Sequence, residues 1–167
     1  MEPSGSYVCT VYTNFLHTMK IEDEIQLKDF KNNYRRMIVN LIFTGNHVHG
    51  IVSSYVKPFG ISLEQHNVLG ILRGQHPAPT TFTAIQERMY NKSSNVTRLV
   101  DKLITMGLVH RELNPEHRRK MNITITDKGL GLLSEVDKVM DQLYAEFHTL
   151  TKDEADTISN LLDKLRN

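Results

Sequence analysis

Small hydrogen-bonding side chains lie near the middle of the chain, followed at helical spacing by two cations. They are Ser93, Ser94, Asn95, Thr97, Arg98 and Lys102. Between them Val96, Leu99, Val100 and Leu103 recur at i, i+3, i+4 and i+7, which predicts an amphipathic helix from Ser93 to Met106 with Ser93 as its N-cap and Gly107 just beyond its end. Such a polar face, led by small residues and an arginine, suits contact with base edges in a DNA major groove. An ordinary surface helix has the same pattern, so this segment alone identifies nothing.

A shorter helix is predicted immediately before it. Thr81 can cap its start, and Ala84, Ile85 and Met89 continue it until the residues 90–92 (YNK) break the pattern. Two helices separated by so short a turn are typical of a helix-turn-helix.

Three consecutive cations, Arg118, Arg119 and Lys120, follow His117 between two apolar segments. Those segments, residues 108–111 and 121–125, predict two strands of a hairpin around residues 114–120. A run of cations is commonly no more than a solvated face. Directly after a helix-turn-helix, however, it is typical of a wing that contacts DNA.

The combination of these motifs resembles the MarR family of transcription regulators. The resemblance is carried by residues 95–103 (NVTRLVDKL), 107–111 (GLVHR), Arg118 with Arg119, and 125–129 (ITDKG), in the family's order and spacing, and it extends roughly over residues 30–166. The chain departs from the family at Asn114 and His117, where the wing often carries acidic residues. A salt bridge inside the wing is therefore expected to be weaker or replaced.

The resemblance implies a mainly α fold with a small β-hairpin wing, comprising a winged helix-turn-helix lobe and a helical dimerisation region. It implies a regulator, taken as a repressor, that binds double-stranded DNA at a pseudopalindromic operator as a homodimer. The residues expected to contact DNA are Ser93, Ser94, Asn95, Thr97, Arg98, Lys102, His117, Arg118, Arg119 and Lys120. Ser94, Asn95, Thr97 and Arg98 are the candidates for base edges or nearby phosphates, and the wing arginines for the minor groove, the backbone or the structure of the wing itself.

The family also commonly holds a small-molecule effector between its lobes. Residues that could line such a pocket, although they are better explained as plain core or dimer residues, are Tyr34, Met37, His47, His66 and Met140.

Together with the remaining helical patterns, these motifs divide the chain into four segments. Residues 1–27 are a tail or extension, 28–60 a first dimerisation helix ended by Pro58 and Gly60, 61–128 the DNA-binding lobe, and 129–167 the C-terminal dimerisation helices. Capping signals begin three of the helices, at Ser62 with Gln65, at Thr126, and at Thr151 with Glu154. The last two helices carry broader apolar stripes than one small lobe needs, which favours a homodimer over a monomeric bundle.

Charge is distributed unevenly, although the chain of 167 residues has a formal net charge of only +1. Residues 80–129 carry nine cations and five acids, whereas the residues after Gly129 carry four cations and eight acids. A basic middle and an acidic end fit a molecule that presents one face to a polyanion.

Other chemistries find little support. Cys9 is the only cysteine, which excludes an intrachain disulfide and a thiolate zinc site, and no neighbouring cation activates it for redox sensing. His47 and His49 point apart on a helix, so no metal is expected, and no cofactor or catalytic motif stands out. Without a signal or membrane-spanning run, the cytoplasm is the expected compartment. The open alternatives are a winged-helix module that binds protein and a redox regulator that uses Cys9.

Overall fold

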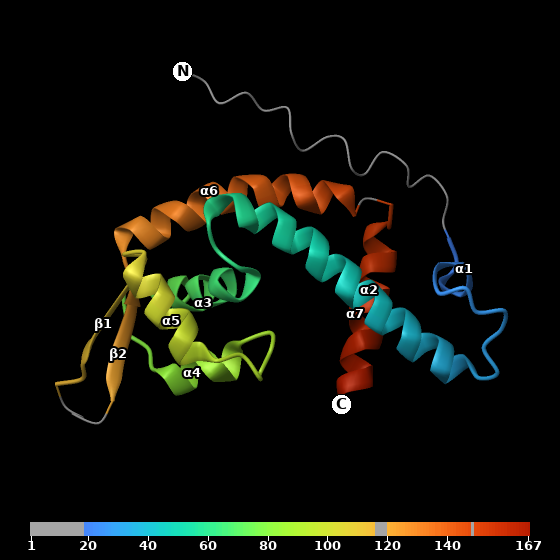
Figure 1. Ribbon diagram of the computed structural model, residues 1–167, viewed down its shortest axis with the longest axis horizontal. Coiled ribbons are helices and arrows are strands. Elements are labelled where there is room, and N and C mark those ends of the chain that lie inside the picture. The colour runs from blue at the N-terminus through green and yellow to red at the C-terminus, as the bar shows by residue number, and fades with distance from the viewer. Residues whose placement is uncertain (1–18, 116–119, 148) are drawn as a thin grey trace, which may run out of the picture. The chain divides into compact units, whose positions relative to one another are not determined.

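The computed structural model describes residues 19–115, 120–147 and 149–167, and these are mainly helical, with one β-hairpin (Figure 1). The elements are α1 (Ile21–Glu24), α2 (Asn33–Val56), the 3-10 helix η1 (Lys57–Phe59), α3 (Leu63–Arg73), α4 (Phe82–Arg88), α5 (Val96–Thr105), β1 (Val109–Leu113), β2 (Met121–Ile125), α6 (Asp127–Glu146) and α7 (Lys152–Arg166). The mainly α fold with a hairpin wing, expected from the sequence, is confirmed. None of the described helices is long and apolar enough to cross a membrane.

The chain divides inside α2 into two compact units, Met1–Val48 and His49–Asn167. In the first unit, Arg36 Nε lies 2.5 Å from Glu22 Oε1 and ties α2 to α1. The sequence did not predict α1, because a single helical turn is too short to show a period. The helix expected from residue 28 begins only at Asn33, where Asn32 Oδ1 accepts the backbone N–H of Tyr34 at 2.7 Å.

In the second unit, α3 is the central element. It contacts α4, α5, α6 and β2, and α5 in turn packs against α4 and β1 (Figure 1). The side chains that are essentially fully buried between these elements are Val56, Val68, Leu69, Ile85, Val100, Leu103, Ile123, Leu133 and Val136. This single apolar core fixes α5 by its inner face and leaves its outer face open.

The hairpin extends the same unit. Its strands are antiparallel, with Val109 opposite Ile125 and Leu113 opposite Met121, so β1 runs two residues beyond the expected strand. Thr80, just before α4, joins the hairpin edge, since it exchanges two backbone hydrogen bonds of 3.0 and 2.9 Å with Ile123. The hairpin is thus attached to the helix-turn-helix on two sides. Thr80 before α4 bonds to β2, and α5 packs against β1.

The expected helix starts are confirmed at four positions. Ser62 and Gln65 form a reciprocal capping box, as do Thr151 and Glu154, and the hydroxyls of Thr81 and Thr126 each accept a backbone N–H of their helix. These caps satisfy donors that a helix leaves without intrahelical partners.

Candidate nucleic-acid interface

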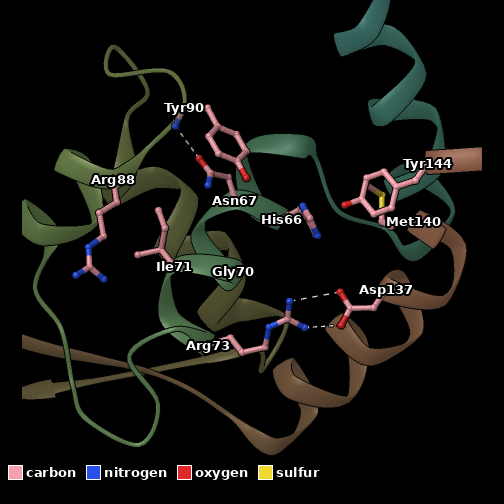
Figure 2. A pocket seen from close by; sticks show the side chains of 10 residues that line it. All are labelled: His66, Asn67, Gly70, Ile71, Arg73, Arg88, Tyr90, Asp137, Met140 and Tyr144. Atoms are coloured by element: carbon pink, nitrogen blue, oxygen red, sulfur yellow. Dashed lines mark hydrogen bonds and ion pairs between the residues drawn. The ribbon is translucent and has the colours of Figure 1, made fainter. Parts of the chain in front are cut away.

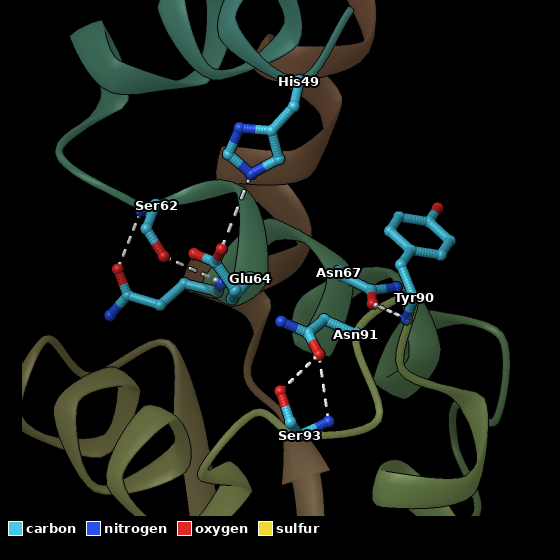
Figure 3. A network of polar contacts seen from close by, with 8 residues as sticks. His49, Ser62, Glu64, Asn67, Tyr90, Asn91 and Ser93 are labelled. Atoms are coloured by element: carbon cyan, nitrogen blue, oxygen red, sulfur yellow. Dashed lines mark hydrogen bonds and ion pairs between the residues drawn. The ribbon is translucent and has the colours of Figure 1, made fainter. Parts of the chain in front are cut away.

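Helix α5 begins two residues later than its sequence pattern suggests. The N-cap is Asn95, whose Oδ1 accepts the backbone N–H of Arg98 at 3.0 Å, and the prediction of Ser93 as the cap was wrong. The N–H and hydroxyl of Ser93 both donate to Asn91 Oδ1, at 3.0 and 2.7 Å (Figure 3). Because Asn91 holds Ser93 in the turn, Ser93 is not available to cap the helix.

The outer face of α5 is polar and exposed. Val96, Val100 and Leu103 are buried, while the opposite side carries Thr97, Arg98, Asp101 and Lys102. Asn95 is exposed at the start of the helix, and Ser94 is half-buried. Of the residues expected to read bases, the structure thus brings Asn95, Thr97 and Arg98 together at the N-terminal end of one exposed surface.

The end of α5 is held by the start of α6. Gly107 has the left-handed φ of 73° expected just after a helix. Thr126 Oγ1 donates to the carbonyl of Gly107 and Lys128 Nζ to that of Met106, both at 2.8 Å. A Cβ on Gly129 would lie 2.4 Å from the carbonyl oxygen of Leu108, so this close approach requires glycine.

The wing is joined to α5 by an ion pair, since Arg111 Nη1 lies 2.7 Å from Asp101 Oδ1. Within the hairpin, Asn114 Nδ2 donates to Asn122 Oδ1 at 2.9 Å. This pair of amides includes Asn114, a position at which the wing of the family often carries an acidic residue. Lys120 is exposed immediately before β2, on the loop side of the hairpin. The expected contacts His117, Arg118 and Arg119 lie outside the described residues.

The described cations of α5, the hairpin and the start of α6 fall into two groups. Arg111 is paired and Lys128 is bound to a helix end, whereas Arg98, Lys102 and Lys120 are exposed and make no ion pair with any described residue. Lys120 also lines a groove of about 450 Å³ beside the start of α4, together with Thr81 and Thr83. The three cations can attract phosphate without first breaking a salt bridge.

A cavity of about 400 Å³ lies behind the turn, between α3, the residues after α4, and α6 (Figure 2). Its lining residues are His66, Asn67, Gly70, Ile71, Arg73, Arg88, Tyr90, Asp137, Met140 and Tyr144. Two of the five residues expected at a ligand pocket, His66 and Met140, line this cavity. Tyr34, Met37 and His47 belong to the other compact unit.

The polar chemistry of this cavity centres on His66 and an ion pair. Arg73 Nη1 lies 2.6 Å from Asp137 Oδ2, which links α3 to α6. His66 Nδ1 is buried without a hydrogen-bond partner in the described part of the chain. Burial lowers the pKa of His66; Asp137 opposes this shift and Arg73 adds to it. A neutral imidazole is thus favoured in the cavity wall.

Sequence reasoning missed two residues that position the surface, Asn67 and Lys128. Asn67 is a buried polar residue within the apolar pattern of α3, and its Oδ1 accepts the backbone N–H of Tyr90 at 2.8 Å (Figure 3). A polar residue at a core position was the available signal. Lys128 was counted simply as one cation of a basic region, and its bond across the fold has no local signal.

Among the described residues no group of three His, Cys, Asp or Glu side chains could hold a metal ion. Cys9, considered as a redox centre, lies outside the described residues. The assembled chemistry is that of hydrogen bonding and phosphate attraction.

The chain is similar to known proteins over the same region. The model of the MarR family matches residues 59–120, which include α3, α4, α5 and β1. YkoM, an uncharacterised HTH-type transcriptional regulator of Bacillus subtilis, is 31% identical over 109 residues, covering 65% of this chain and 70% of YkoM. The multiple antibiotic resistance protein MarR of Escherichia coli is 27% identical over 117 residues, covering 69% of this chain and 80% of MarR.

A solved structure extends the likeness to three dimensions. The crystal structure of a mutant E. coli MarR complexed with operator DNA has a TM-score of 0.69 and 26% identity, and the match covers 80% of this chain and 98% of that one. The helix-turn-helix, the hairpin and the sequence relatives agree. The chain therefore belongs to the MarR family and is a DNA-binding transcription regulator, not an enzyme.

Proposed function

We propose that this regulator reads a pseudopalindromic operator by placing the N-terminal end of α5 in the major groove. The observation that carries the proposal is the exposed surface of α5, where Arg98 and Lys102 are free of ion pairs with the described residues while the opposite face is buried in the core. A helix held this firmly presents its side chains in fixed positions, which base recognition requires. The operator-bound structure of E. coli MarR supports it by analogy.

The residues take different roles in this proposal. Arg98, Thr97, Asn95 and Ser94 contact base edges or the adjacent phosphates, and Lys102 contacts the backbone. Lys120 contributes a second backbone contact beside Thr83, and His117, Arg118 and Arg119 extend this contact through the wing. Ser93 supports the turn and makes at most a peripheral contact, because its hydroxyl is bonded to Asn91.

The proposed active form is a homodimer. Residues 28–60 and 129–167 supply its helices, residues 61–128 read DNA, and residues 1–27 form an extension. The support is the exposed apolar side chains along α2 and α7, among them Ile38, Ile42 and Leu161. Two recognition helices related by a two-fold axis match the symmetry of a pseudopalindrome.

A small molecule in the cavity would regulate DNA binding. The cavity contacts both α6, which is one of the proposed dimerisation helices, and the turn before α5. A ligand that binds one arrangement of these elements better than another shifts DNA affinity by that difference. We further propose that the protein acts as a repressor in the cytoplasm, released from its operator by this effector.

The test is selection of bound fragments from the source genome with the full-length protein, followed by gel shifts of the selected fragments and of the DNA upstream of its own gene. Recovery of a common palindromic sequence, bound in preference to a scrambled fragment of equal length, is the expected result. Equal retention of all fragments would contradict sequence-specific reading. Failure to retain any DNA would favour the alternative, a winged-helix module that binds another protein.

A further inference from the structure

A buried side-chain amide connects α3 to the turn that precedes the recognition helix. Asn67 is only 5% exposed and lies on α3 directly before the buried Val68 and Leu69. Burial of an amide without a hydrogen bond is costly, so a buried asparagine is expected to have a structural partner. That partner is the backbone N–H of Tyr90, which donates to Asn67 Oδ1 at 2.8 Å (Figure 3).

The partner occupies the point at which α4 stops. Met89, the C-cap of α4, has extended backbone angles of −60° and 140°, so the next N–H, that of Tyr90, is directed away from the helix and toward α3. The phenol of Tyr90 is 80% exposed and gives the turn little apolar anchorage. The attachment of this residue to the core is therefore made through its backbone and the Asn67 amide.

The other side-chain hydrogen bonds of the turn are local. Asn91 bonds to Ser93 within the turn, and Gln86 Nε2 of α4 donates to the carbonyl of Lys92 at 2.6 Å. These bonds shape the turn but do not connect it to any element outside the two helices. Among the described residues, the Asn67 bond supplies that connection.

We propose that Asn67 is a positioning residue for DNA reading: its amide fixes the turn on α3 and thereby sets the exact position of the turn that leads into α5, whose inner face the apolar core holds. The inference rests on the proposed placement of α5 in the major groove. Asn67 and Tyr90 also both line the cavity (Figure 2).

The expected consequence is a loss of selectivity rather than of all DNA binding. Base contacts depend on the exact position of α5, whereas contacts between cations and phosphates tolerate displacement. Without the Asn67 acceptor, the turn can shift to hydrate the Tyr90 N–H. Operator binding then weakens, while binding to unrelated DNA is preserved.

The main test compares Asn67→Leu, which has a similar volume but no acceptor, with Asn67→Asp, which keeps an oxygen acceptor. For Asn67→Leu we expect operator affinity to fall about tenfold, the size associated with one unsatisfied buried donor, with affinity for a scrambled fragment unchanged. Hydrogen exchange at the Tyr90 amide should accelerate in Asn67→Leu and stay slow in Asn67→Asp. Asn67→Asp should also retain most of the operator preference.

The matched control is Val68→Ala, a buried substitution at the next residue of the same helix that makes a cavity but removes no hydrogen bond. It should lower the unfolding temperature but leave the ratio of operator to scrambled affinity intact. If Val68→Ala reduces this ratio as much as Asn67→Leu does, Asn67 acts only through stability and the proposal is overturned.

Two further outcomes separate this inference from the proposed function. The positioning role alone is overturned if wild type prefers the operator and Asn67→Leu prefers it to the same degree. It is also overturned if hydrogen exchange at the Tyr90 amide is unchanged in Asn67→Leu. A wild type without sequence preference overturns the proposed reading of DNA and this inference with it. Should Asn67→Leu fail to fold, Asn67→Ser, too short to reach Tyr90 but easily hydrated, provides the same comparison.

Discussion

The DNA-reading lobe and the terminal helices use apolar residues in opposite ways. In the lobe, Leu69, Ile85 and Ile123 are completely buried and a single core holds α3, α4, α5 and the hairpin together. In α7 no residue is buried, and Ile158, Leu161 and Leu165 are 45%, 60% and 51% exposed. The lobe buries its apolar residues within one chain. The apolar side of α7 stays exposed and can pack against another molecule.

This difference separates two sources of stability. The lobe is stabilised by burial within the chain, at roughly 25 cal/mol for each Å² of apolar surface removed from water. Helix α7 has a capping box and local hydrogen bonds, but local terms alone give only marginal helices of this length in water. Its apolar face therefore gains stability when a second copy covers it, as the proposed homodimer requires.

The largest expected effect comes from disrupting that face. In the double variant Leu161→Asp with Leu165→Asp, we expect dimer formation to be lost, because two carboxylates would have to be buried in an apolar interface. Operator affinity should fall by about a hundredfold or more, since the advantage of binding two half-sites from one dimer is lost. Light scattering and operator titration would measure the two effects.

Asn160→Asp is the control, since it adds a carboxylate to the polar side of the same helix and should change neither quantity much. A wild type that scatters as a monomer at micromolar concentration would contradict the dimer. A double variant that stays dimeric would instead place the interface elsewhere.

The next effect concerns the junction between the two regions, where α6 begins. Gly129→Ala should destabilise the protein by about 1–3 kcal/mol, because its new methyl group would overlap the carbonyl oxygen of Leu108 and the side chain of Ile125. Urea unfolding at a fixed protein concentration would measure it.

Gly131, two residues later on α6, offers the matched control, because a Cβ added there would meet nothing within 4 Å. Gly131→Ala should therefore stabilise by up to about 1 kcal/mol, through better helix propensity. If both alanines had the same effect, the close approach at Gly129 would not be a constraint on the fold.

Local features of this fold were predictable from the sequence and long-range ones were not. Thr126 and the Ser62 capping box were identified because a cap depends on residues within one turn. Ser93 was misassigned because another side chain in the turn, Asn91, competes for it. Lys128 was missed because its acceptor lies 22 residues earlier in the chain. The helical period of α7 was recognised, but a period does not specify what covers the face.

Within the lobe, substitutions of residues that contact bases and of residues that contact phosphates should have different effects on DNA binding. Arg98→Ala should cost about 1–3 kcal/mol of operator binding and relax the sequence preference, if Arg98 meets a base edge. Lys120→Ala should weaken binding on all sequences alike and reduce its dependence on salt. Competitive titrations with operator and point-mutated operators would distinguish them. An Arg98→Ala protein with unaltered preference would show that another part of α5 reads the bases.

The smallest expected effect follows from the partial burial of His66 in the wall of the cavity. Burial lowers the pKa of His66, against the pull of Asp137 and with the help of Arg73, so the folded protein resists protonation that the unfolded chain accepts near the ordinary value of about 6.5. The stability contributed by neutral His66 is therefore fully present above about pH 6.5. It is lost as the pH falls below that value toward the lowered pKa of the folded state.

Substitution of the ring should remove this dependence. The free energy of unfolding of wild type should decrease between pH 7.5 and 5.5 by more than that of His66→Phe, which keeps an aromatic ring of similar size but cannot be protonated. His76→Gln, at an exposed histidine in the loop after α3, controls for substitution of a histidine as such and should follow wild type. Protein concentration must be constant, because dimer dissociation also contributes to the measured stability. Parallel curves for wild type and His66→Phe would mean that the cavity admits enough water to solvate the charged imidazole, and that the lobe is less tightly closed on this side than at its apolar core.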